Sequence, residues 1–336
     1  MNIVFIGDCD YNTGPSNVNK SFRRYLSEQI YFLKYKQKIV RAAEAAVSVL
    51  KAEAVIISGL SIINGLALNE AAILKKPVIY IMHGCYAYEC EINRFNKDNK
   101  ALQLEKKMLE KASIIVTVSE KYMNLVAAHF PEYKNKLTYI NNGIEWSDFV
   151  NVCNHTDSCD PYMILSMGGG RPQKNNIVVC DAVQILNEKY HKPFQYIVLG
   201  RDYQDTPKIK QKKYTNYVGQ VSRKEVLEWL EKTSIYIQNS SYESFGLAPI
   251  EALCMGCNLL ISQNVGAISI LNTITESDMI LDCMNAEEIA QKIMQVYNNN
   301  NQNRLLSGID RDTSSCEFAS RKLMEIITNY KYMRRK

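Results

Sequence analysis

Two glutamates, Glu243 and Glu251, lie on either side of a short glycine-containing segment, with seven residues between them. Gly246 and Pro249 in this segment are typical of a loop that turns into a helix. Carboxylates accept paired hydrogen bonds from neighbouring hydroxyls, such as those of a ribose or a pyranose, and loop amides suit phosphate oxygens. A capping glutamate and a solvated helix glutamate are the alternative interpretation, and this spacing by itself leaves both open.

A second group of polar residues begins where three glycines, residues 168–170, are followed by Arg171 and Lys174. Glycines free the backbone for close approach to an anion, and the two cations suit a diphosphate. An ordinary glycine turn with two surface cations is the alternative. The density of donors favours the phosphate interpretation.

The first half of the chain has fewer such residues. His83 ends an apolar run and precedes Gly84, a position from which an imidazole can hydrogen-bond a hydroxyl or stabilise developing charge. A satisfied, partly buried histidine explains the same pattern equally well. Near the N-terminus, Gly14 lies in a loop that also holds Asp8 and Asp10, an Asp-x-Asp pair of the kind that holds a metal in some sugar transferases. We interpret these two acids as loop caps.

The elements that position these residues alternate along the chain. Short β-rich apolar runs, separated by amphipathic stretches, predict buried strands at residues 2–7, 54–58, 77–82, 113–118 and 137–140, and again at 162–167, 195–199, 214–218, 235–238 and 258–262. Because such alternation forms βαβ units, we predict an α/β fold with two Rossmann-like parallel-sheet domains facing a cleft. A polar linker at 153–161 separates them, and ligands are expected at the carboxyl ends of the strands.

Composition excludes several classes of protein. The 336 residues are 46% hydrophobic and carry a net charge of only +5, which excludes disorder and histone-like nucleic-acid binding. The N-terminal residues show no signal-peptide pattern, and no apolar stretch is long enough to span a bilayer, so we expect a cytoplasmic protein. We expect its ten cysteines to be free and mostly buried thiols.

One segment suggests contact with a membrane. Residues 20–51 carry eight Lys and Arg against two Glu, interleaved with aromatic and aliphatic residues. As a basic amphipathic helix, this segment is suited to an anionic bilayer surface, which would make the protein peripheral at the inner face of the membrane. A packed helix with a solvated basic face is the alternative, and the pattern leaves both open.

Taken together, these segments resemble a retaining glycosyltransferase of the GT-B fold, from the large GT4 group (glycosyltransferase group 1). The glutamate pair 243 and 251 is the most specific mark. Further matching segments fall in the family's order at residues 79–84, 116–119, 141–145, 168–174, 198–200, 217–219 and 251–253. The resemblance implies an acceptor-binding domain at 1–155, a nucleotide-sugar-binding domain at 156–314, and a last helix at 315–336 packing back on the first domain.

The resemblance also implies residue roles. Glu251 binds the ribose of a sugar nucleotide, Glu243 binds the transferred sugar, and His83 contacts that sugar near the reacting carbon. Lys174 and Arg171 neutralise the leaving diphosphate. We take His83, Lys174 and Glu243 as catalytic, and the remaining expected donor contacts are Gly14, Gly169, Gly170, Ser244, Phe245, Gly246 and Leu247.

The sequence departs from the family pattern in two places. The usual phosphate arginine falls at Gly169, so Arg171 is displaced by two residues. After Gly266, the common second glycine is Ala267 and the acid that often follows is absent. The diphosphate then relies on Arg171 from a new position, or on Lys174 and amides.

These features predict a retaining transferase that moves a hexose or N-acetylhexosamine from a nucleotide sugar to a saccharide or lipid-linked saccharide in surface polysaccharide synthesis. The resemblance to the family favours UDP as the nucleotide. Such enzymes use cations and amides in place of a metal, so we expect no cofactor. We also expect no nucleic-acid partner. The alternatives are a nucleotide-sugar epimerase or a sugar phosphorylase on the same fold, and an inactive sugar-nucleotide-binding subunit.

Overall fold

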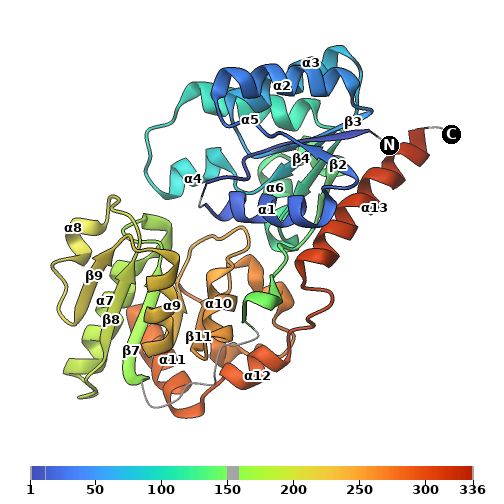
Figure 1. Cartoon of the computed structure of the whole chain (residues 1–336). Coiled ribbons are helices and arrows are strands. Elements are labelled where there is room, and N and C mark those ends of the chain that lie inside the picture. The colour runs from blue at the N-terminus through green and yellow to red at the C-terminus, as the bar shows by residue number, and fades with distance from the viewer. Residues whose placement is uncertain (1, 12, 150–158, 335–336) are drawn as a thin grey trace. The chain divides into compact units, whose positions relative to one another are not determined.

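The structure is a computed structural model that describes residues 2–11, 13–149 and 159–334. The chain forms two compact units, which Figure 1 colours from the N-terminus to the C-terminus. The first unit holds Met1–Cys90, Asn96–Glu145 and Arg311–Lys336, and the second holds Glu91–Phe95 and Trp146–Asp310. The expected domain boundary at 155/156 and most of the expected linker at 153–161 lie outside the described residues.

The first unit is built on a six-stranded parallel sheet with the strand order β2-β1-β3-β4-β5-β6. The strands are β1 (Ile3–Ile6), β2 (Ile30–Phe32), β3 (Ala54–Ser58), β4 (Val78–Met82), β5 (Ile114–Thr117) and β6 (Leu137–Tyr139). The helices are α1 (Gly14–Leu26), α2 (Lys38–Lys51), α3 (Ile62–Ile73), α4 (Tyr86–Ile92), α5 (Asn99–Lys111), α6 (Glu120–His129) and α13 (Cys316–Arg334), with the 3₁₀ turn η1 (Pro131–Lys136).

Helices cover both faces of this sheet, so its central strands are buried on both sides, as parallel sheets require. Strand side chains alternate between the two faces. Ile3 and Phe5 pack with residues of α1 and α13, whereas α2, α3 and α5 pack together elsewhere in the unit (Figure 1). The last helix of the chain therefore belongs to the core of the first unit.

The second unit repeats this architecture with the strand order β12-β11-β10-β7-β8-β9. Its strands are β7 (Asp160–Met167), β8 (Gln195–Leu199), β9 (Thr215–Gly219), β10 (Thr233–Gln238), β11 (Asn258–Ser262) and β12 (Met279–Ile280). Its helices are α7 (Asn176–Glu188), α8 (Thr206–Ile209), α9 (Arg223–Lys232), α10 (Ala248–Cys254), α11 (Ala286–Asn299) and α12 (Gln302–Ser307), with 3₁₀ turns η2 (Trp146–Phe149), η3 (Pro172–Lys174), η4 (Gly266–Ile270) and η5 (Glu276–Asp278).

Two six-stranded parallel sheets with surrounding helices confirm the predicted α/β architecture. All ten predicted strands are present, within two residues at either end. The prediction missed β2 and β12, which have three and two residues and lie at sheet edges.

The prediction of a single basic helix over residues 20–51 is wrong. The segment contains the end of α1, the strand β2 and the helix α2. Its apolar residues Phe22, Leu26, Ile30 and Phe32 are at most 7% exposed because they fill the core beneath α1 and β2. These side chains are therefore not available to a membrane.

Two further observations concern composition. Within the described residues, no helix combines the length and apolar character needed to cross a bilayer. The nine described cysteines are free thiols, and seven of them are buried, as expected from the sequence.

Candidate functional site

The candidate ligand site of the second unit lies at the carboxyl edge of its sheet. β7 and β10 are neighbouring parallel strands whose onward connections leave in opposite directions, to β8 and to β11. This is a topological switch point, the place where open α/β sheets bind ligands. The loops that follow β7 and β10 carry the glycine run with its two cations and the first of the paired glutamates.

Lys174 and Glu243 form an ion pair between these two loops. Their side chains are 13% and 19% exposed, so the pair is shielded from water yet accessible to a ligand. Gln238 also contacts the carboxylate, because its Nε2 lies 3.3 Å from Glu243 Oε2. The Gln238 amide is itself oriented by the buried phenol of Tyr236, which donates to its Oε1 at 2.8 Å.

The opposite oxygen of the Glu243 carboxylate is open to a ligand. Both contacts, from Lys174 and from Gln238, fall on Oε2. Within the described residues no donor reaches Oε1, which leaves this oxygen as a hydrogen-bond acceptor for a hydroxyl. The pKa of the buried Tyr236 lies well above its ordinary value. Burial is the main cause, and the negative charges of Glu243 and Glu251 raise this pKa further.

Lys174 is fixed because the residues on both sides of it are tied to the loop after β10. Asn175, in the left-handed region at φ 48°, donates from Nδ2 to Ser241 Oγ at 2.7 Å. Gln173 donates from Nε2 to the Tyr242 carbonyl at 3.2 Å. Gln173 is also bonded to Asn93, whose Nδ2 donates to Gln173 Oε1 at 2.7 Å. These buried polar contacts leave the lysine stem little freedom to move away from Glu243.

The glycine run shapes this corner of the second unit. A Cβ at Gly168, where φ is +118°, would lie 2.8 Å from the Lys174 stem, and one at Gly169 or Gly170 would collide with residues 201 or 206. The amides of Gly168 and Gly169 donate to the Leu199 carbonyl, and that of Gly170 to the Arg201 carbonyl. The glycines thus allow close packing around Lys174, while their amides are already used inside the protein.

Arg171 has a partner of its own, Tyr203. Its guanidinium lies over the Tyr203 ring, 5.0 Å from the centroid, and Nη2 donates to the Tyr203 hydroxyl at 3.0 Å. The Arg171 Nε is buried without an acceptor within the described chain. An unsatisfied guanidinium donor is a favourable partner for an anion.

The loop from Glu243 to Leu247 is pinned along one side by the loop after β11. Gly266 N donates to the Glu243 carbonyl at 3.0 Å, and Ala267 N donates to the Phe245 carbonyl at 2.7 Å. Gly246 has φ +87°, a conformation that favours glycine. Ser244 is half-buried and the Phe245 ring is fully buried.

The amides of this loop are the second group of open polar atoms. Within the described chain, the backbone N–H groups of Phe245, Gly246 and Leu247 have no acceptor. They follow one another directly before α10. Three successive backbone donors without acceptors are suited to binding phosphate oxygens.

Glu251 lies in the first turn of α10, where Arg223 pairs with it. Arg223 begins α9, and its Nη1 lies 2.6 Å from Glu251 Oε2. The carboxylate is 23% exposed and the guanidinium 52%, so the pair is open to solvent. Glu243 and Glu251 thus each have a basic partner from another segment.

In the first unit, His83 follows β4 and belongs to a chain of hydrogen bonds. Asn19 Nδ2 donates to the Asp8 carbonyl at 2.7 Å, which turns Asn19 Oδ1 toward Ser58. Ser58 Oγ donates to that oxygen at 2.7 Å, and it lies 2.8 Å from His83 Nε2. Because the serine proton is committed to Asn19, the hydroxyl accepts from His83, and Nε2 carries the imidazole proton.

The ring of His83 is therefore neutral, with Nδ1 as a hydrogen-bond acceptor. Burial lowers the pKa of His83 from 6.5 to about 4. At neutral pH this side chain can accept a hydrogen bond from a sugar hydroxyl, but it carries no positive charge for a phosphate.

The first loop of the chain has the capping role expected for its acids. Asp8 accepts from the Asp10 amide at 3.2 Å and from Ser16 Oγ, while Asp10 faces Arg23 and Lys36. Gly14 opens α1 directly after the capping Thr13, and a Cβ added to it would meet no atom within 4 Å. Gly14 therefore leaves open space at the start of this helix.

Sequence reasoning missed the residues that position the site. Gln238, Arg223 and Tyr203 each touch a predicted site residue, yet none belongs to a motif. Asn19 and Ser58 were missed in the same way. The available signal is that Gln238 and Ser58 are the last residues of central strands, where polar side chains face the ligand edge.

Comparisons with known proteins concern the family and the fold of the chain. Residues 155–308 match the family model described as glycosyl transferases group 1. No curated protein sequence matches the chain.

Solved structures match over nearly the whole chain. HepE of Anabaena, solved with UDP and glucose, has a TM-score of 0.67 at 11% identity, covering 98% of this chain and 100% of its own. Sucrose-phosphate synthase of Thermosynechococcus elongatus has a TM-score of 0.73 at 13% identity, covering 99% of this chain and 100% of its own. The lipopolysaccharide outer core galactosyltransferase WaaB has a TM-score of 0.66 at 13% identity, covering 98% of this chain and 100% of its own. At such identity the structures establish the GT-B fold, and the family match supports a glycosyltransferase.

Proposed function

We propose that this protein is a retaining glycosyltransferase of the GT4 type that transfers a hexose or N-acetylhexosamine from a UDP-sugar to a saccharide acceptor. The observation that carries the proposal is the Lys174–Glu243 pair at the switch point of the second sheet, with Glu251 on the following helix. All three residues fall within the segment that matches the glycosyltransferase family.

In this proposal the second unit binds the donor. Glu251 accepts hydrogen bonds from the two ribose hydroxyls and exchanges its contact with Arg223 for them. The open Oε1 of Glu243 accepts from a hydroxyl of the transferred sugar. The diphosphate lies against Lys174, the unsatisfied Nε of Arg171 and the amides of Phe245 to Leu247.

The reaction is a front-face substitution that needs no metal. The bond between the anomeric carbon and the diphosphate oxygen breaks with both electrons on the phosphate, while the acceptor hydroxyl attacks from the same face. The leaving phosphate takes the hydroxyl proton. Lys174 and Arg171 stabilise the charge that develops on the diphosphate, and stabilisation of this kind supplies a large part of many enzymatic accelerations.

The first unit contributes His83 and the open start of α1 at Gly14. A neutral His83 accepts a sugar hydroxyl at Nδ1, and its Nε2–H stays with Ser58. In this proposal His83 orients the sugar and carries no positive charge toward the phosphate at neutral pH.

For the acceptor we propose a saccharide, free or linked to a lipid, in surface polysaccharide synthesis. Among the structural matches, WaaB is a lipopolysaccharide galactosyltransferase and HepE was solved with UDP and glucose. HepE thus supports a UDP donor, and WaaB supports a glycan product, for a chain of this fold.

Calorimetric titration with UDP, GDP, ADP and their sugars tests the donor part. We expect saturable UDP binding that Glu251→Ala weakens at least tenfold. Glu228→Ala is the matched control, because Glu228 pairs with Lys224 on α9 in an ion pair that touches no site residue. Preference for GDP or ADP would replace the UDP assignment, and absence of nucleotide binding would favour an inactive protein.

Product analysis tests the reaction. Proton NMR of the glycoside should show the anomeric configuration of the donor, and chelation of metals should leave the rate unchanged. An inverted product would overturn the mechanism. Donor epimerisation without acceptor, or turnover with inorganic phosphate, would replace transfer with the corresponding reaction.

A further inference from the structure

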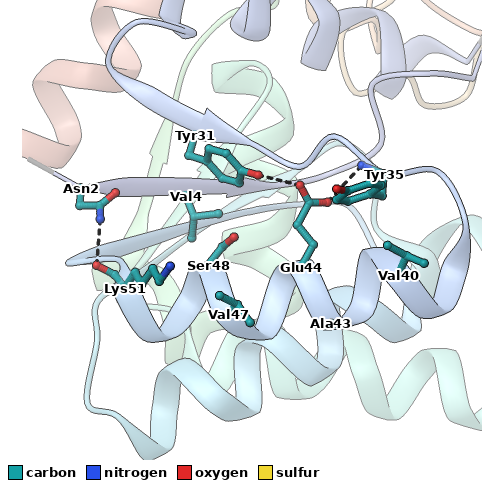
Figure 2. A pocket seen from close by; sticks show the side chains of 10 residues that line it. All are labelled: Asn2, Val4, Tyr31, Tyr35, Val40, Ala43, Glu44, Val47, Ser48 and Lys51. Atoms are coloured by element: carbon teal, nitrogen blue, oxygen red, sulfur yellow. Dashed lines mark hydrogen bonds between the residues drawn. The ribbon is translucent and has the colours of Figure 1, made fainter.

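A groove lies between α2 and the strands β1 and β2 of the first unit (Figure 2). Its volume of about 520 Å³ falls within the roughly 300–1,000 Å³ of pockets that hold small ligands. The groove exists because β2 is the edge strand of the sheet, whereas α2 packs against β1 and α3. None of its lining residues belongs to the candidate site described above.

The groove extends from one edge of the first sheet to the other. At one end, Arg41 donates from Nη1 to the Tyr35 carbonyl at 2.9 Å and from Nη2 to the Gly7 carbonyl at 2.6 Å. Because Gly7 directly follows β1, this end lies beside the carboxyl end of that strand. At the other end, Asn2 precedes β1, and its Nδ2 donates to the carbonyl of Lys51, the last residue of α2, at 3.0 Å.

The wall formed by α2 carries two rows of side chains. The apolar row is Val40, Ala43 and Val47, and the polar row is Glu44, Ser48 and Lys51. Because residues three or four apart lie on the same side of a helix, both rows follow the groove. From Val40 to Lys51 the helix rises about 16 Å, at 1.5 Å per residue. An occupant therefore meets an apolar and a polar surface along the same line.

The opposite wall is aromatic and is held by Glu44. Tyr31 and Tyr35 line it and are 37% and 55% exposed. The Tyr31 hydroxyl donates to Glu44 Oε1 at 2.7 Å, and the Tyr35 amide donates to Glu44 Oε2 at 3.1 Å (Figure 2). The hydrogen bond to Glu44, and then burial, raise the pKa of Tyr31 to about 12, so its hydroxyl stays protonated. The phenol of Tyr31 and the backbone of Tyr35 are thus fixed before any ligand binds.

Several polar atoms of the groove are open to a ligand. Within the part of the chain that the structure describes, the hydroxyls of Ser48 and Tyr35 and the ammonium of Lys51 have no hydrogen-bond partner. The Asn2 amide uses only Nδ2, which leaves its Oδ1 as an acceptor. The groove therefore offers both donors and acceptors beside its apolar row.

These features fit the chemistry of a sugar. A pyranose has an apolar face of C–H groups and a rim of hydroxyls, each of which both donates and accepts. Exposed tyrosine rings contact apolar surface, while a few placed polar groups fix its orientation. The charged side chains that line the groove, Glu44 and Lys51, have opposite signs, so they favour a neutral occupant.

Other small ligands match the groove less well. An acyl chain would cover the polar row and leave its donors and acceptors without partners. A phosphorylated ligand would meet the carboxylate of Glu44 as well as the ammonium of Lys51. The length of the two rows favours a chain of rings over a single ring.

We propose that this groove binds a neutral oligosaccharide, with its rings against the tyrosines and the apolar row of α2 and its hydroxyls on the polar row. The proposal rests on the proposed function in one respect, namely that the bound oligosaccharide is a part of the glycan acceptor that does not react. Contacts that are the same before and during a reaction lower KM without raising kcat. We therefore expect longer acceptors to have a lower KM.

Saturation-transfer NMR of the full chain, without nucleotide, tests the groove. The neutral probes are maltohexaose, cellohexaose and chitohexaose with their disaccharides, and the charged probe is hexagalacturonate. We expect at least one neutral hexasaccharide to bind, and its disaccharide to bind about tenfold more weakly because it reaches fewer contacts. Hexagalacturonate should bind no better than the neutral hexasaccharide.

Substitutions on both walls assign the binding to the groove. Ala43→Trp fills the groove and should abolish binding, whereas Ala46→Trp is the matched control, because Ala46 is exposed on the same helix outside the groove. Tyr35→Ala should weaken binding about fivefold, and Tyr35→Phe should keep most of it because the ring is retained. Unchanged thermal melting of each variant shows that the fold is intact.

The outcomes separate this proposal from the proposed function. Absence of binding by all three neutral hexasaccharides, stronger binding of hexagalacturonate, or binding that Ala43→Trp leaves unchanged would overturn the groove. Glu251→Ala should lose UDP binding and keep oligosaccharide binding. Oligosaccharide binding by a chain that binds no nucleotide would support the groove and refute the proposed transferase.

Discussion

The guanidinium of Arg223 lies 2.6 Å from Oε2 of Glu251, so the carboxylate proposed for the ribose is paired before any nucleotide arrives. Arg223 begins α9 and Glu251 lies in the first turn of α10, so they come from separate segments of the second unit. Binding of a ribose therefore exchanges one interaction of Glu251 for another.

Removal of Arg223 should tighten UDP binding. An exposed ion pair is worth about 0.2–1 kcal/mol, so freeing Glu251 from it should lower the UDP Kd up to about fivefold. Calorimetry of Arg223→Ala measures this effect, with Lys224→Ala, the neighbouring surface cation, as the control. Weaker binding of UDP would instead make Arg223 a ligand of the nucleotide.

Loss of Lys174 should reduce the rate of transfer. Because its charge is proposed to stabilise the leaving diphosphate, Lys174→Met should lower kcat by about 10²–10³-fold, while Lys174→Arg should keep part of the rate. Lys213→Met is a matched control, since Lys213 pairs with Glu188 at 3.6 Å on the surface of the same unit. Single-turnover kinetics with saturating donor give the comparison, and a change in KM alone would argue for a binding role.

The pKa of His83 predicts how stability depends on pH. Burial lowers this pKa to about 4, so between pH 6.5 and 4 the unfolded chain takes up a proton that the folded chain does not. Stability should therefore fall with decreasing pH in this window, by up to about 1.4 kcal/mol per pH unit from this group. Urea unfolding of wild type and His83→Gln at pH 7 and 5 isolates the effect. An identical pH dependence of the two proteins would contradict it.

Activity should not follow a titration of His83 near pH 6.5. A neutral ring held by Ser58 has no change of charge there, so kcat should be level through this pH. Ser58→Ala removes the acceptor of Nε2–H and frees the ring to turn, so we expect a loss of kcat of about tenfold with intact UDP binding. A pH profile that breaks at 6.5 in the wild type would show that His83 is solvated.

The lowered pKa of Asp278 predicts a second loss of stability, in the second unit and at more acidic pH. Burial favours its neutral form, but hydrogen bonds from Arg304 at 2.7 and 2.9 Å, and from Asn301 and Thr275, outweigh burial and lower its pKa. Its contribution to stability is complete above about pH 4 and is lost as the pH falls through the folded pKa. Asp278→Asn should cost about 3 kcal/mol at pH 7 in urea unfolding, and this cost should shrink as the pH falls below about 4. A cost that stays constant down to the acid unfolding of the wild type would refute this account.

Much of the fold was predictable because buried parallel strands are continuous apolar runs. The edge strand β2 was missed, and the reason is its alternation: Ile30 and Phe32 are buried while Tyr31 is 37% exposed. Over three residues this period of two is too short to stand out from the helical spacing of Phe22 and Leu26 just before it. For this reason the sequence analysis predicted one basic helix over residues 20–51.

The candidate site was predictable only in part, for a related reason. Glu243, Glu251 and Lys174 lie in local motifs, whereas Arg223 and Gln238 reach them across strands and helices. Such partners depend on the order of strands in the sheet, which local spacing does not encode. The glycine run shows the opposite case, because its motif was visible but its amides are used within the protein.

The helix α13 closes the first unit with the last residues of the chain. Ile144 N donates to the Ser314 carbonyl at 2.8 Å, and Ala319, Leu323 and Ile327 complete the core under β1 and β3. During synthesis the strands of this unit emerge first, but the helix that covers them is made after the whole second unit. At about 5–20 residues per second, the part of this sheet face that α13 covers stays exposed for many seconds. The half of the protein that is translated first is thus the half that finishes folding last.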